Sequence, residues 1–443
     1  MVVFRPFRGW KYNPEVVGDL NKVVCPPYDL ITPELQESLL KRSPYNVVHL
    51  EAGENLDWNA PGGNTYRSAT DLFEEWLRRG VLRREPEPCF YLTRHIYQFQ
   101  GQTRSRIGIT GCVRLAQYDS QEVFPHEFTE EPAVMDRVAL MEACSANFSP
   151  IMSLYRDPSK FLDLIFEEVM SEPPAIQVHP DENQEMSLWL ISQSDQQIRI
   201  RHFFNDTPVF LADGHHRYEA ALRFQAKRAR DGGYQIATPE DNDSVMMTLI
   251  EFDDPGLLVL PYHRVVSGLT GGMLAQLQER LLQLFDVNPS GLPSIEPGDG
   301  EPGDGDTADS LLNQVVGMGD DAKALGVLGP ASENPRLLSL KKEVNWQEWG
   351  PLAVSEAWIL EEQVLKPVLG DLLPDRVTYI HDHEQAMEQV RSGDSQMAFL
   401  VKPFPMNQFY DVVSQGQRLP RKSTFFYPKL PTGLVINQLD GAF

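Results

Sequence analysis

The sequence predicts an α/β or α+β protein in which mixed sheets pack against helices. Strand-like and helix-like patterns alternate along most of the chain. The run VMMTLIEF, residues 245–252, is short and almost wholly apolar, which is typical of a strand buried on both faces. The run VFLA, residues 209–212, leads directly into HHRYEAALRFQAKRAR, residues 215–230, whose spacing predicts an amphipathic helix.

The remaining elements follow from local signals. Thr32 before Pro33 predicts a helix start, because threonine caps a helix and proline fits its first turn. Gly101 and Gln102 lie between two long alternating runs and predict a hairpin. The other predicted helices are residues 68–79, 135–146, 160–170, 354–369 and 383–393. The predicted strands are residues 89–99, 104–115, 149–155, 175–179, 185–191, 376–380 and 396–403.

The length of 443 residues favours two or three domains. Residues 289–310 are rich in glycine, proline and aspartate without periodicity, which predicts a flexible acidic linker or insertion. We therefore expect an N-terminal α/β part over residues 1–150, a core part over 151–288 and a C-terminal α/β part over 311–443.

The composition excludes several classes of protein. The sequence contains no run of about 18 apolar residues, so no membrane span is predicted. The net charge of −24 would repel nucleic acid, so a DNA-binding or RNA-binding role is not expected. The start MVVFRPFRGW lacks the apolar core of a secretory signal, and the four cysteines show no CxxC spacing. These features predict a reduced, cytoplasmic protein.

The stretch ADGHHR places Asp213, Gly214, His215, His216 and Arg217 where a strand is expected to pass into a helix. Asp213 can cap the helix, Gly214 permits close backbone approach, and the first N–H groups of a helix favour an anion. The histidines and the arginine would add charge-assisted donors for phosphate. The alternative is that the aspartate only caps the helix and one histidine is a core residue.

Two further stretches carry chemistry. In VFPHEFTEE, Glu127 beside His126 could act as a general base toward an alcohol or bind a divalent cation, or be a surface pair without function. In RLPRKSTFFYPKLPTG, Lys422, Ser423 and Thr424 could hold a phosphoryl group. Alternatively, this loop only places positive charge at a sheet edge.

Taken in order, PHE, DGHHR and the lysine-hydroxyl stretch resemble the free serine kinases of the ParB/sulfiredoxin-like fold group. Nearly the whole chain is similar to the large uncharacterised prokaryotic family catalogued as domain of unknown function 1015, through VCPPYDLI, PHEFT, ANFSPI, ADGHHRYEAA, LPYHRV and KSTFFYPKLPTGLV. The resemblance implies a ParB/sulfiredoxin-like catalytic core with additional layers. Where the kinases have arginine and histidine after the hydroxyls, this chain has Phe425 and Phe426.

The resemblance implies phosphoryl transfer from ADP or ATP, with Mg²⁺, to free serine or a similar small hydroxylated metabolite. It implies that Glu127 is the base, and we add His126 and His216 as further catalytic candidates. The phosphate-binding residues would be Asp213, Gly214, His215, His216, Arg217, Lys422, Ser423 and Thr424. The competing hypothesis is a nucleotide-binding, ParB-like regulatory or scaffold protein without turnover, which would need the ADGHHR turn but no base.

The stretch VVCPPYDLI contributes two substrate-binding candidates. Tyr28 and Asp29 follow a rigid Pro-Pro turn and could hold a substrate amine. Cys25 precedes that turn, and its neighbours supply no clear cation that would lower a thiol pKa. We therefore expect Cys25 to be a small packing residue rather than a reactive one.

Overall fold

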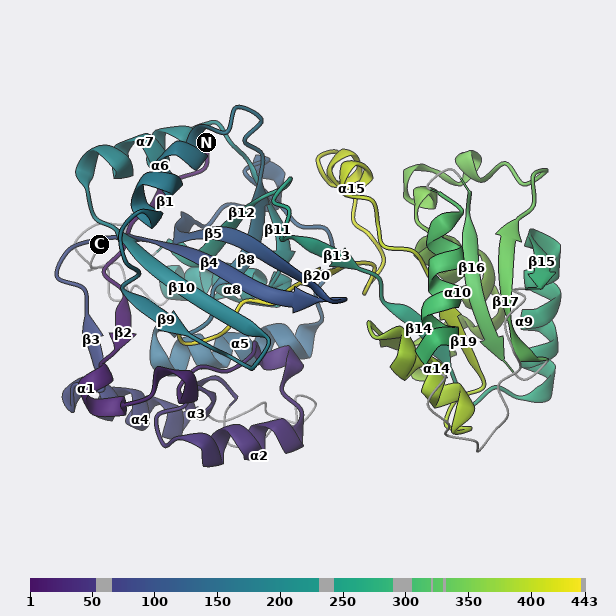
Figure 1. Ribbon diagram of the computed structural model, residues 1–443, viewed down its shortest axis with the longest axis horizontal. Helices are drawn as coiled ribbons and strands as arrows, with labels where there is room; N and C mark the ends of the chain where they lie inside the picture. The colour runs from purple at the N-terminus through teal and green to yellow at the C-terminus, as the bar shows by residue number, and fades with distance from the viewer. Residues whose placement is uncertain (53–65, 231–242, 290–304, 320–321, 330–331, 440–443) are drawn as a thin grey trace. The chain divides into compact units, whose positions relative to one another are not determined.

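The computed structural model describes residues 1–52, 66–230, 243–289, 305–319, 322–329 and 332–439 (Figure 1). Contacts divide the chain into two compact units, Met1–Leu258 with Pro428–Phe443 and Val259–Tyr427. The four-part division expected from the sequence stays a prediction. Of its linker, residues 290–304 lie outside the described residues, whereas residues 305–310 belong to helix α10 (Gly305–Gly317).

The first unit is built on a nine-stranded mixed sheet, which confirms the predicted α/β class. Its main order is β6-β11-β8-β12-β5-β4-β10-β9, and β1 pairs with β5. The strands are β1 (Phe4–Arg5), β4 (Phe90–Phe99), β5 (Gln102–Arg114), β6 (Val123–Phe124), β8 (Ile151–Tyr155), β9 (Ile176–Val178), β10 (Gln184–Ile191), β11 (Val209–Asp213) and β12 (Ser244–Glu251). Strand β12 runs parallel to β8 and antiparallel to β5.

Helices pack around this sheet, together with two small strand pairs. The helices are α1 (Pro14–Val17), α2 (Pro33–Arg42), α3 (Val48–Glu51), α4 (Arg67–Arg78), α5 (Glu131–Cys144), α6 (Phe161–Met170), α7 (Ser194–Asn205) and α8 (His215–Arg230). Strand β2 (Trp10–Tyr12) pairs with β3 (Leu82–Arg84), and β7 (Ala146–Asn147) pairs with β21 (Asn437–Gln438). Among the described residues, none of the helices combines the length and hydrophobicity that a membrane span requires.

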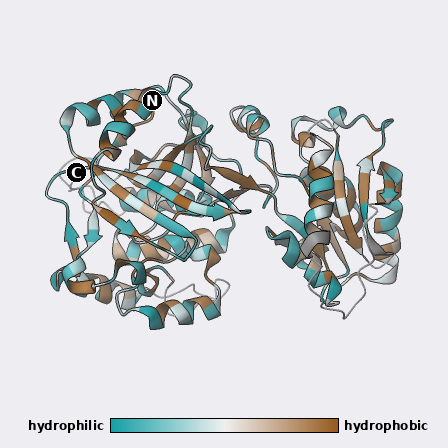
Figure 2. Ribbon diagram, viewed as in Figure 1, coloured by the Kyte–Doolittle hydropathy of each residue, from teal (hydrophilic) through white to brown (hydrophobic). Residues whose placement is uncertain are grey.

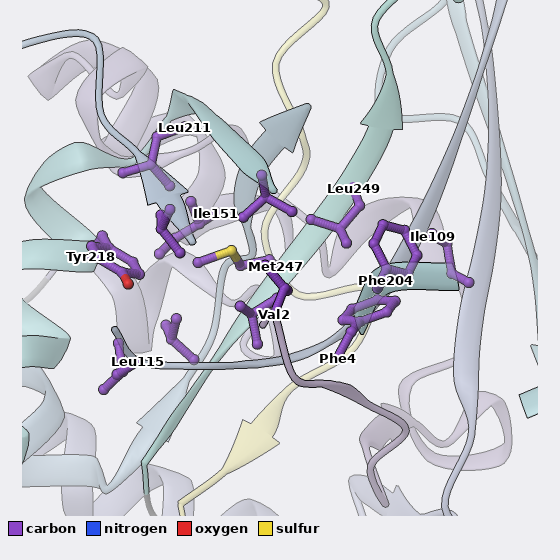
Figure 3. Close-up of a cluster of buried hydrophobic side chains, with 14 of the residues drawn as sticks. Val2, Phe4, Ile109, Leu115, Ile151, Phe204, Leu211, Tyr218, Met247 and Leu249 are labelled. Carbon is purple, nitrogen blue, oxygen red and sulfur yellow. The ribbon is translucent and has the colours of Figure 1, made fainter. Parts of the chain in front are cut away.

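Both faces of the sheet are covered, which explains why every residue of β12 is buried. Met247 and Leu249 point into a core that also receives Phe204 of α7 and Tyr218 of α8 (Figure 3). On the other face, Met246 and Thr248 meet Leu430, Pro431 and Val435 across a cavity of only about 20 Å³. Apolar residues accordingly run along the strands (Figure 2). The chain therefore returns after the second unit to cover this face.

Cys25 contacts the same C-terminal segment that covers this face of the sheet. Its backbone exchanges hydrogen bonds with that of Thr432, with N–H···O distances of 3.3 and 2.8 Å. The cysteine is 3% exposed, and burial raises the pKa of its thiol well above the usual value. The thiol is therefore protonated at neutral pH and serves packing, as expected.

The second unit contains a six-stranded sheet in the order β15-β17-β16-β19-β14-β18 and the pair β13-β20. Its strands are β13 (Leu258–Leu260), β14 (His263–Val266), β15 (Phe285–Pro289), β16 (Ala324–Gly329), β17 (Ser332–Leu340), β18 (Val377–Ile380), β19 (Met397–Leu400) and β20 (Phe425–Tyr427). Helix α9 (Gly271–Leu284) and the helical residues 356–369 share one apolar cluster, and α10 and α14 (His383–Arg391) share another. Helices α13 (Leu373–Arg376) and α15 (Met406–Val413) complete the described helices.

The predicted hairpin and most predicted elements are confirmed. Gln100 and Gly101, both with positive φ, form the tight turn between β4 and β5. The helix predicted over residues 354–369 is interrupted, because residues Ile359–Leu365 adopt a π-helical turn between α11 (Glu356–Trp358) and α12 (Lys366–Leu369). Helix α7 was not expected, since its sequence SDQQIRIRHFFN offers only a narrow apolar face.

The buried His95 gives the first unit a predictable pH dependence. Its Nε2 donates to Gln184 Oε1 at 2.7 Å, and its Nδ1 lies 3.5 Å from Arg106 Nη2. Burial, followed by the Arg106 charge, lowers the pKa of His95 to about 3. The neutral ring is therefore the folded form, whereas an unfolded histidine takes up a proton below about pH 6.5.

We expect His95 to contribute stability above about pH 6.5 that is lost as the pH falls toward 3, at a little over 1 kcal/mol per pH unit. Chemical unfolding of the first unit between pH 4 and 6 measures this slope. His95→Gln should reduce the slope by the equivalent of one proton. A variant with the wild-type slope would show that His95 titrates normally.

Candidate functional site

The ADGHHR stretch forms the turn between β11 and α8, as its sequence predicted. Gly214 has a φ of 96°, and its carbonyl accepts the Tyr218 N–H at 2.9 Å, which is the first bond of the helix. A Cβ at Gly214 would lie 2.9 Å from Arg217 Nε. Glycine is required here both for the backbone conformation and because the arginine folds back over the turn.

Asp213 lies between two cations at this turn. Its Oδ2 accepts from Arg217 Nη2 at 2.5 Å, and its Oδ1 accepts from Lys429 Nζ. The three side chains are 10 or 11% exposed. Two positive charges and one negative charge leave a net positive charge of one beside the N-terminus of α8, where an anion is favoured.

Arg217 is directed inward rather than toward solvent. Its Nη1 donates to Ser149 Oγ at 3.1 Å and to the Pro150 carbonyl at 2.7 Å. The expected role of this guanidinium as a direct phosphate donor therefore requires it to release or share these partners. In the structure its charge acts together with that of Lys429.

The two histidines connect this turn to the loop between β6 and α5. This loop carries the motif Pro125-His126-Glu127 and is called the PHE loop below. His215 Nε2 accepts the backbone N–H of His126 at 3.2 Å, and His216 Nε2 accepts that of Glu130 at 3.1 Å. These Nε2 atoms therefore act as acceptors, whereas the sequence suggested donors toward an anion. The two bonds hold a loop against a helix 86 or more residues later in the chain.

His126 and Glu127 lie together at this junction. His126 is buried, its Nδ1 donates to the Leu211 carbonyl at 2.6 Å, and its ring meets that of His215 edge-on with centroids 4.5 Å apart. Its Nε2 is 3.7 Å from Glu127 Oε1, and the glutamate side chain is 18% exposed. Burial lowers the pKa of His126, so at neutral pH its Nε2 carries a lone pair close to a partly accessible carboxylate.

Tyr28 is buried in a network that leads to the same turn. The Arg137 guanidinium lies 4.1 Å from the centroid of its ring, and Arg137 Nη1 pairs with Glu51 Oε1 at 3.2 Å. Glu51 Oε1 also accepts from Ser149 Oγ at 3.1 Å. Burial raises the pKa of the Tyr28 hydroxyl, whereas Asp29 is exposed. The structure thus places Tyr28 in this network and Asp29 at the surface.

The sequence did not assign Lys429, Ser149, Glu51 or Arg137 to this cluster, although Lys429 belongs to the stretch RLPRKSTFFYPKLPTG that it singled out. Lys429 is 216 residues from Asp213. The sequence offered only a weak signal for Lys429. The residues around it in YPKLP are mostly apolar, which is an unusual setting for a charged side chain. A charge embedded in an otherwise apolar segment indicates a buried ion pair.

Lys422, Ser423 and Thr424 belong to the second unit. Lys422 has a φ of 54°, and its Nζ lies 5.1 Å from the centroid of the Tyr262 ring. Ser423 is buried and donates to the Pro420 carbonyl at 2.7 Å. The ADGHHR turn belongs to the first unit, and the approach of these three residues to it stays a prediction.

Among the described residues, no group of three or more His, Cys, Asp or Glu side chains converges as a metal site. Mg²⁺ binds through one or two carboxylates, water and substrate phosphates rather than a full protein cage. Glu127 and Asp213 therefore fit Mg²⁺ only as an ion that arrives with phosphate groups.

Comparison with known proteins gives one family and several weak structural resemblances. Residues 4–354 match the family described as "Protein of unknown function (DUF1015)". No curated protein matches the sequence.

Three solved structures illustrate the structural resemblances. A mutant free serine kinase in complex with ADP has a TM-score of 0.36 at 11% identity, covering 73% of this chain and 91% of that one. A free serine kinase in complex with AMP has a TM-score of 0.35 at 12% identity, with coverages of 73% and 90%. SbnI with C-terminal truncation from Staphylococcus aureus has a TM-score of 0.35 at 10% identity, with coverages of 74% and 87%.

The position of Asp213 between two cations predicts an asymmetric effect on stability. Asp213→Asn leaves Arg217 and Lys429 adjacent without their shared anion and should cost about 3–5 kcal/mol. Lys429→Met leaves the Asp213–Arg217 pair intact and should cost clearly less, about 1–2 kcal/mol. Denaturant unfolding measures both values. A lysine variant as unstable as the aspartate variant would show that the arginine does not neutralise Asp213.

Proposed function

Because the chain belongs to the DUF1015 family, whose description gives no activity, we propose its function from the site: a small-molecule kinase. It would transfer a phosphoryl group from ADP or ATP to the hydroxyl of free serine or of a similar small metabolite. The observation that carries this proposal is the pair of histidine hydrogen bonds, which fixes the Glu127 loop beside the cationic turn at the start of α8.

The cationic turn supplies the phosphate subsite. Phosphoryl transfer depends mainly on positioning and on neutralising the charge of the phosphates. The N-terminus of α8 favours an anion, and the Asp213–Arg217–Lys429 cluster adds its net positive charge. A phosphate group at this turn would be attracted by both, and Lys429 would exchange part of its contact with Asp213 for the phosphate.

Glu127 supplies the base. A hydroxyl is a poor nucleophile at neutral pH, so a carboxylate that accepts its proton assists attack on phosphorus. The substrate oxygen forms the new P–O bond, its proton passes to Glu127, and the bond from phosphorus to the departing nucleotide oxygen breaks. The pair of electrons in that bond leaves with the nucleotide.

His126 is placed to take part in this proton transfer. Its Nδ1–H is held by the Leu211 carbonyl, so the lone pair of its Nε2 faces Glu127 at 3.7 Å. A protonated Glu127 can therefore donate a hydrogen bond to Nε2 after the transfer. His216 is held by Glu130 N–H and has a positioning role in this scheme.

The remaining candidates have supporting roles. Glu127 and Asp213 are the nearby carboxylates that would hold Mg²⁺, which when bound would supply positive charge to the phosphates. The exposed Asp29 would hold a substrate amine, next to Tyr28. Lys422, Ser423 and Thr424 would be further phosphoryl-binding residues.

The activity is tested by incubating the purified protein with Mg²⁺, each nucleotide and a panel of small hydroxy acids and amino acids, and by detecting phosphorylated product. Product formation supports the kinase. Nucleotide binding without product for any acceptor would favour a regulatory or scaffold protein. Failure to bind any nucleotide would overturn both.

Glu127→Gln should remove most turnover, about 10²- to 10⁴-fold, because the amide cannot accept the proton. Nucleotide affinity should be kept or rise slightly, since a negative charge near the phosphates is removed. Kinetics and calorimetry separate the two effects. Glu130→Gln is the matched control, because this exposed carboxylate is in the same loop and the substitution keeps the backbone N–H that Glu130 donates to His216. Equal losses in both variants would exclude a base role for Glu127.

Lys429→Met should weaken nucleotide binding by about 1.5–3 kcal/mol, the usual scale for one hydrogen bond to a charged group. Calorimetric titration with ADP and with ATP measures the loss. Lys227→Met is the control, because Lys227 pairs with Glu142 on the surface, at the far end of α8. An unchanged affinity in the Lys429 variant would place the phosphates elsewhere.

A further inference from the structure

A second cavity in the first unit lies at the carboxyl ends of two parallel strands. Its volume is about 170 Å³. Its lining is Ile107, Tyr155, Lys160, Asp163, Phe166, Glu167, Met170, Glu251, Asp254 and Pro255. Tyr155 ends β8, Glu251 ends β12, and the two residues are paired in the sheet. Ligands of α/β proteins commonly bind at this end of parallel strands.

This acidic cavity is distinct from the candidate kinase site. Strand β11 runs antiparallel to β8, and Asp213 is paired with Met152 near the beginning of β8. Glu251 is paired with Tyr155 at the end of β8. The cationic turn and the acidic cavity are therefore at opposite ends of the same strand.

The charge of the lining is strongly negative. Four carboxylates line the cavity with one lysine. Asp163 and Glu167 stand four residues apart on α6, where two like charges destabilise a helix. A cation between them would convert this repulsion into attraction.

Glu251 gives the cluster an incompletely satisfied carboxylate. The residue is 7% exposed, and its Oε2 accepts from Lys160 Nζ at 3.0 Å and from the Asp253 N–H at 2.9 Å. Its Oε1 is buried and has no hydrogen-bond partner among the described residues. A buried carboxylate oxygen without a donor is costly, so a ligand N–H donor would be stabilising here.

The Asp254 carboxylate already accepts hydrogen bonds from backbone N–H groups. Its two oxygens accept from the Ile107 N–H at 2.9 Å and the Gly256 N–H at 2.8 Å. It therefore shapes the loop and contributes negative charge, while Glu251 remains the carboxylate able to bind a donor directly. The lysine that now contacts Glu251 is 51% exposed and lies at the edge of the cavity.

The other walls are apolar. Ile107, Phe166, Met170 and Pro255 line the cavity, with the ring of Tyr155. Such walls suit a short hydrocarbon chain, and aromatic rings also favour an ammonium group. A bare divalent ion is disfavoured, because no three His, Cys, Asp or Glu side chains of the described chain converge to hold a metal.

We propose that this acidic cavity binds a small organic ammonium ion, with the ammonium paired with the Glu251 carboxylate and the alkyl part against Phe166 and Met170. The lysine at the edge occupies Oε2 and competes electrostatically with the ligand. The ligand class is thus a primary alkylamine, and its binding does not depend on the proposed kinase activity.

The test is calorimetric titration of the full-length protein with n-butylammonium, with 1-butanol as the neutral probe of similar shape. We expect the ammonium to bind and the alcohol not to bind. Glu251→Gln should weaken binding about tenfold or more, because a charged hydrogen-bond partner is lost. Lys160→Met should strengthen binding severalfold, because a competing positive charge is removed.

Two controls keep the result interpretable. Glu167→Gln also removes a lining charge from an exposed position, so it should weaken binding even if the buried Glu251 variant is unstable. Glu168→Gln changes the neighbouring carboxylate, which is outside the lining, and should leave the affinity unchanged. Equal affinities for ammonium and alcohol, unchanged affinity in both lining variants, or binding of Mg²⁺ or Ca²⁺ in place of the ammonium would overturn the proposal.

Discussion

The Asp213 carboxylate, which pairs with both Arg217 and Lys429, is the constraint on which the first unit depends. The lysine belongs to the segment that returns after the second unit, and the residues that follow it cover one face of the nine-stranded sheet. The aspartate ends β11 and pairs with Arg217 at the start of α8. A single carboxylate therefore fixes the end of the chain, a strand and a helix at one point.

The histidines of ADGHHR show how structural and chemical roles are divided at this point. Their Nε2 atoms accept backbone N–H groups of the PHE loop, so they position that loop instead of pointing at a ligand. This leaves Glu127 as the partly accessible group, with the buried His126 behind it. The arrangement places a carboxylate close to a cationic helix start, and the proposed phosphoryl transfer to a hydroxyl rests on this combination.

Strand β8 separates two sites of opposite charge. One end faces the cluster of Asp213, Arg217 and Lys429, with its net positive charge, and the other end faces the acidic cavity around Glu251. Such a separation allows an anionic and a cationic ligand to be attracted to different ends of one sheet. The overall charge of −24 conceals this pattern, because it is a sum over the whole chain.

The sequence by itself determined the α/β class, the β4–β5 hairpin, the turn at Gly214 and the buried character of β12, because each depends on periodicity or on residues a few positions apart. It also indicated Glu127 and the ADGHHR turn as candidates. Only the tertiary structure decided that Lys429 pairs with Asp213 and that both histidines accept hydrogen bonds. Only the tertiary structure showed that Glu251 lines a cavity together with residues of α6. These contacts connect residues tens to hundreds of positions apart, and local pattern carries no information about which distant charges become neighbours when strands pair and the chain returns.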